Sequence, residues 1–265
     1  MVNKVLLIGI NYTGTSSQLS GCINDVKNMQ KYLEEHYSID EIKIMTDNCT
    51  DQLYPTRRNI LKQLRWLSKD AQAGDNLFLH YSGHGGQTVD YDGSEEDGKD
   101  ECIYPINGGK IIDDHLNRYL VNPLPDGVKL VCIIDACHSS TMLDLKYHYS
   151  GGQKRSLLNN MLGIWNKSKR NIKKACNKEY QESKATVITI SGCEDHSVSS
   201  DAYINRQSQG AMTYSLLTCI NANPKINYED LINQMNVLLH RKRFSQKPQL
   251  CYGKRMNLRS TVELL

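Results

Sequence analysis

Short apolar runs, separated by segments with helical periodicity, are the feature that most limits what this chain can fold into. The run Val5–Ile10 is typical of a central parallel strand that is covered on both faces. Further strands are predicted at 42–45, 77–81, 130–134 and 186–190. These runs are too short to cross a membrane, since a spanning helix needs about 20 apolar residues.

The segments between the predicted strands have the spacing of amphipathic helices. Val26, Met29 and Leu33 recur at three- and four-residue intervals, and Thr56 is placed to cap a second helix. Further helices are predicted from about 113, over 211–220 and over 231–239. Alternation of this kind indicates an α/β fold with a mainly parallel sheet of about six strands and helices on both faces. Ligands bind such sheets at the carboxyl ends of the strands.

Composition places the chain among soluble globular proteins. Of its 265 residues, 39% are hydrophobic and 23% are charged, which argues against disorder. The first apolar run is too short for a secretory signal, so a cytoplasmic location is expected. The nine cysteines include no C-x-x-C pair, which disfavours a zinc ribbon and predicts mostly reduced, buried thiols.

Charge is distributed unevenly along the chain. Residues 1–145 carry 13 basic and 21 acidic side chains, a net charge of −8, whereas residues 146–265 carry 19 and 8, a net charge of +11. Ten of the basic residues lie in 146–184, which is interpreted as an exposed linker or insertion. A nucleic-acid-binding role is the weakest interpretation of this stretch, because no recognition motif accompanies the charge.

Two segments break the apolar pattern immediately after predicted strands. His80-Tyr81-Ser82-Gly83-His84-Gly85-Gly86 surrounds a histidine with glycines, and Asp135-Ala136-Cys137-His138-Ser139 places a thiol at a strand end. An imidazole near a thiol can hold it as the reactive thiolate. His84 precedes Cys137 by 53 residues, and caspases also have their histidine about 50 residues upstream of the cysteine. His138 is a rival base, but its neighbouring position in the sequence makes it project differently from the thiol.

These two segments resemble the signature blocks of metacaspases, which are caspase-like cysteine peptidases. Further matches are Leu19–Asp25, Pro55–Leu61, Ile111–Asp114, Ser191–Asp195, Gly210–Tyr214 and Pro248–Leu250. The resemblance implies a single caspase-like peptidase domain over 1–265, with a large catalytic part (1–145), the basic linker (146–184) and a small part (185–265). Two departures are Ser140, where the family usually has glycine, and the absence of a proline-rich prodomain from the sequence.

The resemblance implies a role for several residues. His84 would act as general base and acid and Cys137 as nucleophile, with backbone N–H groups near Gly85 and Cys137 receiving the oxyanion. Substrates would be proteins or peptides with Arg or Lys before the scissile bond. The matching pocket positions are Asp25, Ser82, Asp135 and Cys22. Paired carboxylates suit guanidinium and ammonium groups, although each aspartate alone could equally be a helix-terminal or strand-end cap.

Calcium is the cofactor that the resemblance implies, with carboxylate ligands at Asp100, Asp113, Asp114 and Asp144. Hard oxygen ligands of this kind are those that Ca²⁺ prefers. An EF-hand in the acidic loop 90–101 is excluded, because the sixth position is Glu95 or Asp97 where that loop needs glycine.

Self-cleavage, alternative functions and assembly are further expectations. Candidate self-cleavage positions are Lys154, Arg155, Lys169 and Arg170. A calcium-independent, paracaspase-like peptidase and a catalytically inactive scaffold remain alternatives. By the same resemblance the protein is expected to be a monomer.

Overall fold

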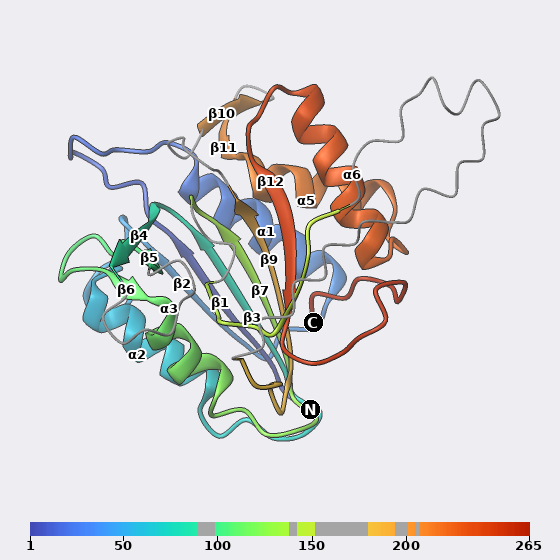
Figure 1. Cartoon of the computed structure of the whole chain (residues 1–265). Helices are drawn as coiled ribbons and strands as arrows, with labels where there is room; N and C mark the ends of the chain where they lie inside the picture. Colours follow the sequence, from blue (N-terminus) through green and yellow to red (C-terminus); the bar gives the residue numbers. More distant parts are fainter. Residues whose placement is uncertain (90–98, 138–141, 152–179, 194–200, 205–206) are drawn as a thin grey trace, which may run out of the picture.

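The computed structural model describes residues 1–265 except 90–98, 138–141, 152–179, 194–200 and 205–206. A seven-stranded sheet forms its centre, where about six strands were predicted (Figure 1). In spatial order its strands are β2 (Glu41–Thr46), β1 (Asn3–Gly9), β3 (Asn76–Ser82), β7 (Lys129–Asp135), β9 (Thr186–Cys193), β12 (Lys247–Tyr252) and β8 (Tyr147–Tyr149).

The first five of these strands are parallel, and the last two extend the sheet antiparallel. β12 pairs antiparallel with both β9 and β8. β8 lies within the stretch 146–184, so the first residues of the expected linker belong to the sheet. Neither β8 nor β12 was among the strands predicted by position, and the three residues of β8 carry too little periodicity to be detected.

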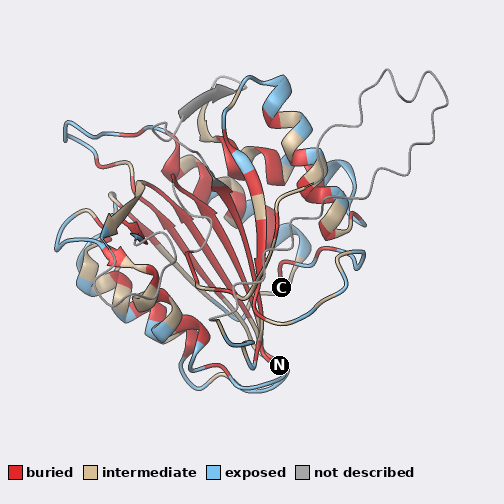
Figure 2. Ribbon diagram, viewed as in Figure 1, coloured by how far each residue is buried: buried red, intermediate tan, exposed pale blue. Residues whose placement is uncertain are grey.

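Helices cover both faces of the sheet, as predicted. On one face lie α1 (Cys22–His36), α5 (Ala211–Ala222) and α6 (Tyr228–Arg241), and on the other lie α2 (Arg57–Ser68) and α3 (Asp113–Leu116), which continues into the π-helical turn η2 (Asn117–Val121). In β1, Leu6 and Ile8 face the α2 side while Val5 and Leu7 face α1. The central strands are therefore buried along most of their length (Figure 2).

Local capping agrees with the sequence at the start of α2. The Thr56 side chain accepts a hydrogen bond from the Asn59 backbone N–H, as its predicted capping role requires. A short 3₁₀ helix, η1 (Asp51–Leu53), precedes α2.

Two small sheets stand at the carboxyl edge of the main sheet. One contains β4 (Gly85–Val89), β5 (Lys99–Ile103) and β6 (Ile111–Ile112), and the other contains β10 (Asp201–Ile204) and β11 (Gln207–Gly210). β4 begins directly after His84, and β11 leads directly into α5. Both small sheets therefore adjoin the edge at which a ligand is expected.

Candidate active site

The ends of β3 and β7 bring the predicted histidine and cysteine to one edge of the sheet. The two strands pair in parallel with Ser82 opposite Asp135, and His84 and Cys137 each follow two residues later. The Gly83 N–H donates to the Asp135 carbonyl at 3.2 Å. A Cβ at Gly85 would overlap the Cys137 carbonyl oxygen, so the chain leaving His84 passes directly over the nucleophile candidate.

Cys137 is buried to the same extent as several cysteines of the core, and its place at a strand end is what distinguishes it. It lies at the end of β7 with 5% of its surface exposed, immediately before residues 138–141, which are outside the described ranges. Burial raises the pKa of Cys102, Cys132 and Cys219, which keeps those thiols protonated. Seven described cysteines are free thiols, as expected for a chain with reduced cysteines.

The His84 imidazole is half-buried and oriented by a backbone carbonyl. Its Nε2 lies 2.7 Å from the Ser17 carbonyl oxygen. Because a carbonyl oxygen only accepts, this contact selects the tautomer with hydrogen on Nε2 and leaves Nδ1 as the basic nitrogen. In the neutral imidazole, Nδ1 is therefore the nitrogen that can accept a proton.

Two buried carboxylates meet beside this edge. Asp25, in the first turn of α1, is fully buried and accepts hydrogen bonds from the Ser82 hydroxyl at 2.7 Å and the Gly210 N–H at 2.9 Å. Asp135 accepts a hydrogen bond from the Thr213 N–H at 2.7 Å. A Cβ at Gly210 would overlap the Asp135 Oδ2 and come within 2.6 Å of the Asp25 Oδ2. Both carboxylates therefore flank the same glycine.

The same contacts give the two carboxylates a structural role. Gly210 and Thr213 belong to the amino-terminal end of α5, where the helix dipole favours negative charge. Asp25 and Asp135 thus stabilise the start of α5 whether or not a substrate is bound. The structure places three of the four predicted pocket residues, Asp25, Ser82 and Asp135, in one connected group.

Cys22, the fourth predicted pocket residue, lies one turn before Asp25 on α1. It is buried among apolar side chains, in a cluster that includes Tyr12 and Tyr81. Its backbone carbonyl lies where a Cβ at Gly9 would approach to 2.5 Å, so α1 packs tightly onto the end of β1.

Sequence patterns did not identify Gly210 and Thr213 as part of this group. Gly210 contacts Asp25 across 185 positions and Thr213 contacts Asp135 across 78. The resemblance of Gly210–Tyr214 to the family motif was the one sign in the sequence that this segment matters. No rule of sequence spacing connects the segment to Asp25 or Asp135.

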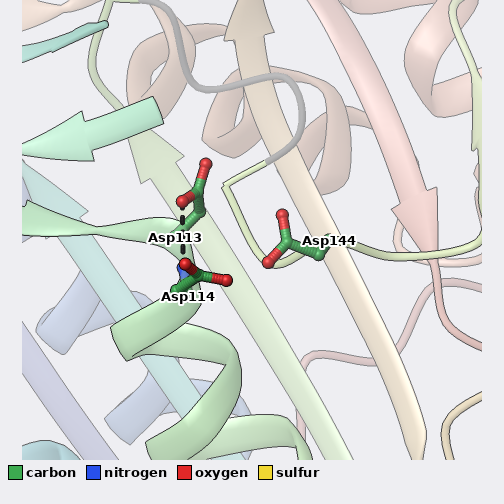
Figure 3. Close-up of side chains that lie close together, drawn as sticks. All are labelled: Asp113, Asp114 and Asp144. Atoms are coloured by element: carbon green, nitrogen blue, oxygen red, sulfur yellow. Dashed lines mark hydrogen bonds between the residues drawn. The ribbon is translucent and has the colours of Figure 1, made fainter. Parts of the chain in front are cut away.

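A second acidic group combines the first two residues of α3 with Asp144, in the segment after Cys137 (Figure 3). Asp113, Asp114 and Asp144 each present a carboxylate oxygen within 4.8 Å of the others. Asp100 is buried on the neighbouring β5 but is not part of this close group of three. Three of the four predicted calcium ligands are thus brought together.

The electrostatics of this group suit a divalent cation. Burial raises the pKa of Asp113 to about 8, and the carboxylates of Glu101 and Asp100 add to the rise. The backbone N–H groups of Asp114 and Glu101 donate to Asp113 and oppose it. Crowded carboxylates in a desolvated place are relieved by a cation with oxygen preference, and Ca²⁺ fits this donor set. Glu101 was not anticipated, and its adjacency to Asp100 was the only signal.

Several expectations concern residues outside the described ranges. These are Lys154, Arg155, Lys169 and Arg170, together with His138 and Ser140. None of the helices within the described ranges combines the length and apolar character needed to cross a membrane.

Comparison with known proteins identifies the family of the chain. Residues 3–146 match the family profile described as "Metacaspase, peptidase C14 domain". Metacaspase-1 of Coccidioides immitis (strain RS) is 45% identical over 93% of this chain and 60% of its own length. Metacaspase-1 of Debaryomyces hansenii is 43% identical over 93% of this chain and 64% of its own length. The chain thus spans less than two thirds of the length of these relatives.

A solved structure shares the fold. The crystal structure of protein GSU0716 from Geobacter sulfurreducens aligns with a TM-score of 0.66 over 99% of this chain and 97% of its own, at 22% identity. That likeness concerns the α/β architecture alone, whereas the sequence matches extend over the histidine and cysteine segments. On these matches, the chain belongs to the metacaspase family of C14 peptidases.

Proposed function

We propose that this chain is a cysteine endopeptidase that cuts proteins after Arg or Lys, with His84 as general base and acid and Cys137 as nucleophile. The observation that carries the proposal is the meeting of four groups at one sheet edge. The two strand ends carry His84 and Cys137, and the paired carboxylates of Asp25 and Asp135 lie beside Ser82. Family membership supports the same chemistry.

The proposed reaction follows from the tautomer that Ser17 selects. Nδ1 of His84 takes the Cys137 proton, and the thiolate attacks the scissile carbonyl carbon to form a tetrahedral oxyanion. Backbone N–H groups near Gly85 and Cys137 stabilise that oxyanion. The C–N bond then breaks as His84 protonates the leaving amine. Water, deprotonated by His84, hydrolyses the thioester and regenerates the thiol.

Specificity for basic residues rests on charge. Asp25 and Asp135 present two buried carboxylates, which pair with a guanidinium bidentately and with an ammonium as a point charge. A substrate aspartate in the same place would be repelled, and this disfavours caspase-like cleavage after Asp. Cys22 is included in the pocket wall through its place one turn before Asp25.

Calcium is proposed as the activating ion, held by Asp113, Asp114 and Asp144 with Asp100 nearby. Asp113 and Asp114 begin α3 directly after β6, and β6 pairs with β5, which pairs with the β4 strand that follows His84. Asp144 lies seven residues beyond Cys137. Bound Ca²⁺ would neutralise the cluster and tie these two segments together.

The remaining parts of the proposal concern processing and assembly. Self-cleavage after Lys154, Arg155, Lys169 or Arg170, a single peptidase domain over 1–265, a cytoplasmic location and a monomeric state belong to it. The sheet supports the single domain, since it takes strands from both 1–145 and 185–265.

The decisive experiment measures hydrolysis of three fluorogenic peptides ending in Arg, Lys or Asp, with Ca²⁺ and with chelator. Cleavage after Arg or Lys that needs Ca²⁺ and is lost in Cys137→Ala is expected. Cys49→Ala, which removes a partly exposed thiol after β2, is the matched control and should retain activity. Activity that survives the chelator would favour the paracaspase-like alternative. No hydrolysis of any peptide would favour the inactive scaffold.

A further inference from the structure

Tyr12, which follows β1, makes several contacts with His84 that have no role in the proposed reaction. The Tyr12 hydroxyl accepts a hydrogen bond from the His84 N–H at 3.0 Å and donates one to the Tyr104 carbonyl at 2.5 Å. The Tyr12 ring packs against the imidazole, with centroids 4.6 Å apart and planes at 36°. Tyr12 thus contacts both the backbone and the side chain of His84.

A second tyrosine, Tyr81, also forms a hydrogen bond with the His84 backbone. The Tyr81 hydroxyl donates to the His84 carbonyl at 2.8 Å, and the Tyr104 N–H donates to the same oxygen at 3.1 Å. The hydroxyl oxygens of Tyr12 and Tyr81 are 3.2 Å apart. Burial raises the pKa of both phenols well above the ordinary value, so each hydroxyl keeps the hydrogen that it donates.

The tyrosine pair also explains the glycine that precedes His84. A Cβ at Gly83 would lie 2.7 Å from the Tyr81 hydroxyl oxygen and 3.1 Å from that of Tyr12. Real Cβ atoms essentially never approach within 3.0 Å, so a side chain here would displace the phenols.

Tyr12 adopts a backbone conformation that the surrounding residues must maintain. Its φ is +52°, in the left-handed region that non-glycine residues rarely adopt. The Asp47 carboxylate accepts the N–H of Asn11 at 2.8 Å with one oxygen and the N–H of Thr13 at 2.9 Å with the other. The Thr15 N–H and hydroxyl both donate to the Tyr12 carbonyl. Strained backbone held by several contacts is common where a group must be positioned for chemistry.

We infer that Tyr12 is a positioning residue for His84, and that Asp47 keeps Tyr12 in its left-handed conformation. This inference rests on the proposed peptidase function. Tyr12 touches no reacting atom, and it fixes the position of the imidazole through the backbone N–H, the Tyr104 carbonyl and the ring contact. Asp47 acts one step further away, through the N–H groups on either side of Tyr12.

The test compares Tyr12→Phe with the wild type and with Tyr32→Phe, which removes the hydroxyl of a buried tyrosine in the other core cluster. Tyr12→Phe keeps the ring and loses the hydroxyl, so kcat for the Arg peptide should fall about 10- to 100-fold. KM should change by less than about two-fold, because the pocket carboxylates are untouched. In Tyr12→Phe the rate at which iodoacetamide alkylates Cys137 should fall together with kcat. In Tyr32→Phe both kcat and this alkylation rate should equal those of the wild type.

A second readout separates this inference from the proposed function. Imidazole ¹H–¹⁵N spectra report the tautomer and position of His84 whether or not any peptide is cleaved. A shifted or exchange-broadened Nε2–H signal in Tyr12→Phe supports the inference even if the wild type proves inactive. Unchanged spectra together with unchanged alkylation would overturn it.

Asp47→Asn provides a second test that can be used if Tyr12→Phe does not fold. An asparagine has one acceptor oxygen in place of two, so one of the two N–H groups loses its partner. The same decrease in kcat and the same spectral change are expected, at smaller size. A folded Asp47→Asn with wild-type alkylation and spectra would refute the role of Asp47.

Discussion

Gly85 lies against the carbonyl oxygen of Cys137, so closely that a Cβ at Gly85 would overlap that oxygen and come within 2.9 Å of the Ala136 Cβ. This contact joins the segment after His84 to the segment that carries the thiol. Gly85→Ala is therefore expected to push the two segments apart and lower kcat/KM at least about 100-fold. Gly74→Ala serves as the control for general loss of stability, because its left-handed φ of +96° strains an alanine although no atom lies within 4 Å of the added Cβ. Equal activity in the two variants would show that the contact is not needed.

The negative charge of the pocket carboxylates should determine substrate specificity, whereas their hydrogen bonds to the start of α5 support the fold. Asp135→Asn preserves the acceptor for the Thr213 N–H but removes the charge, so KM for Arg and Lys peptides should rise and kcat/KM should fall at least about 100-fold. Asp126→Asn, which changes a carboxylate paired with Lys254 on the surface, is the matched control. Retention of cleavage after Arg in Asp135→Asn would exclude the proposed pocket.

The acidic cluster predicts a calcium site that one substitution can weaken. Asp144→Asn should lower Ca²⁺ affinity at least about 10-fold in calorimetry, because it removes one anionic ligand from the three that meet. Asp70→Asn is a close control, since Asp70 and Asp144 both have a left-handed backbone, at φ 58° and 49°, that asparagine tolerates. Equal affinities of the two variants would place the ion elsewhere.

Acid should destabilise the fold partly through His80. Burial lowers the pKa of His80 to about 3, and its Nε2 lies 3.0 Å from the Thr213 hydroxyl. The unfolded chain, with a histidine pKa near 6.5, binds this proton more tightly, so stability falls as the pH drops from about 6.5 towards 3. The residue's contribution to that slope approaches about 1.4 kcal/mol per pH unit.

Denaturant midpoints measured from pH 7 to 4 test this effect. The slope should be shallower in His80→Gln and unchanged in His36→Gln, which alters an exposed histidine at the end of α1. An identical slope in His80→Gln and wild type would assign the acid sensitivity to other groups.

We expect a monomer because β12 is already paired with β8 on its outer side. β8 pairs with β12 through Tyr147 opposite Tyr252 and Tyr149 opposite Leu250, so a second chain cannot pair there without displacing β8. Sedimentation equilibrium at micromolar concentration should give the mass of one chain. A stable dimer whose interface protects β12 from hydrogen exchange would contradict this.

The parts of the fold predicted from sequence are those in which local pattern and burial agree. β1, β3, β7 and β9 appear as apolar runs because both of their faces are buried. The small sheets were missed because their strands are short and pair across loops, and β4 itself begins with two glycines. The histidine and cysteine could be paired in advance because each follows a recognisable strand, whereas Tyr12 gives no signal until its hydroxyl is seen against the His84 N–H.

The strand order has a consequence for any cut between 152 and 179. β7 and β8 precede that segment and β9 and β12 follow it, yet β9 pairs with β7 on one side while β12 pairs with β8 on the other. The strands of the later fragment would be enclosed on both sides by strands of the earlier one. A nicked molecule would therefore remain a tightly associated two-chain particle, with two bands under denaturing conditions and an unchanged native mass.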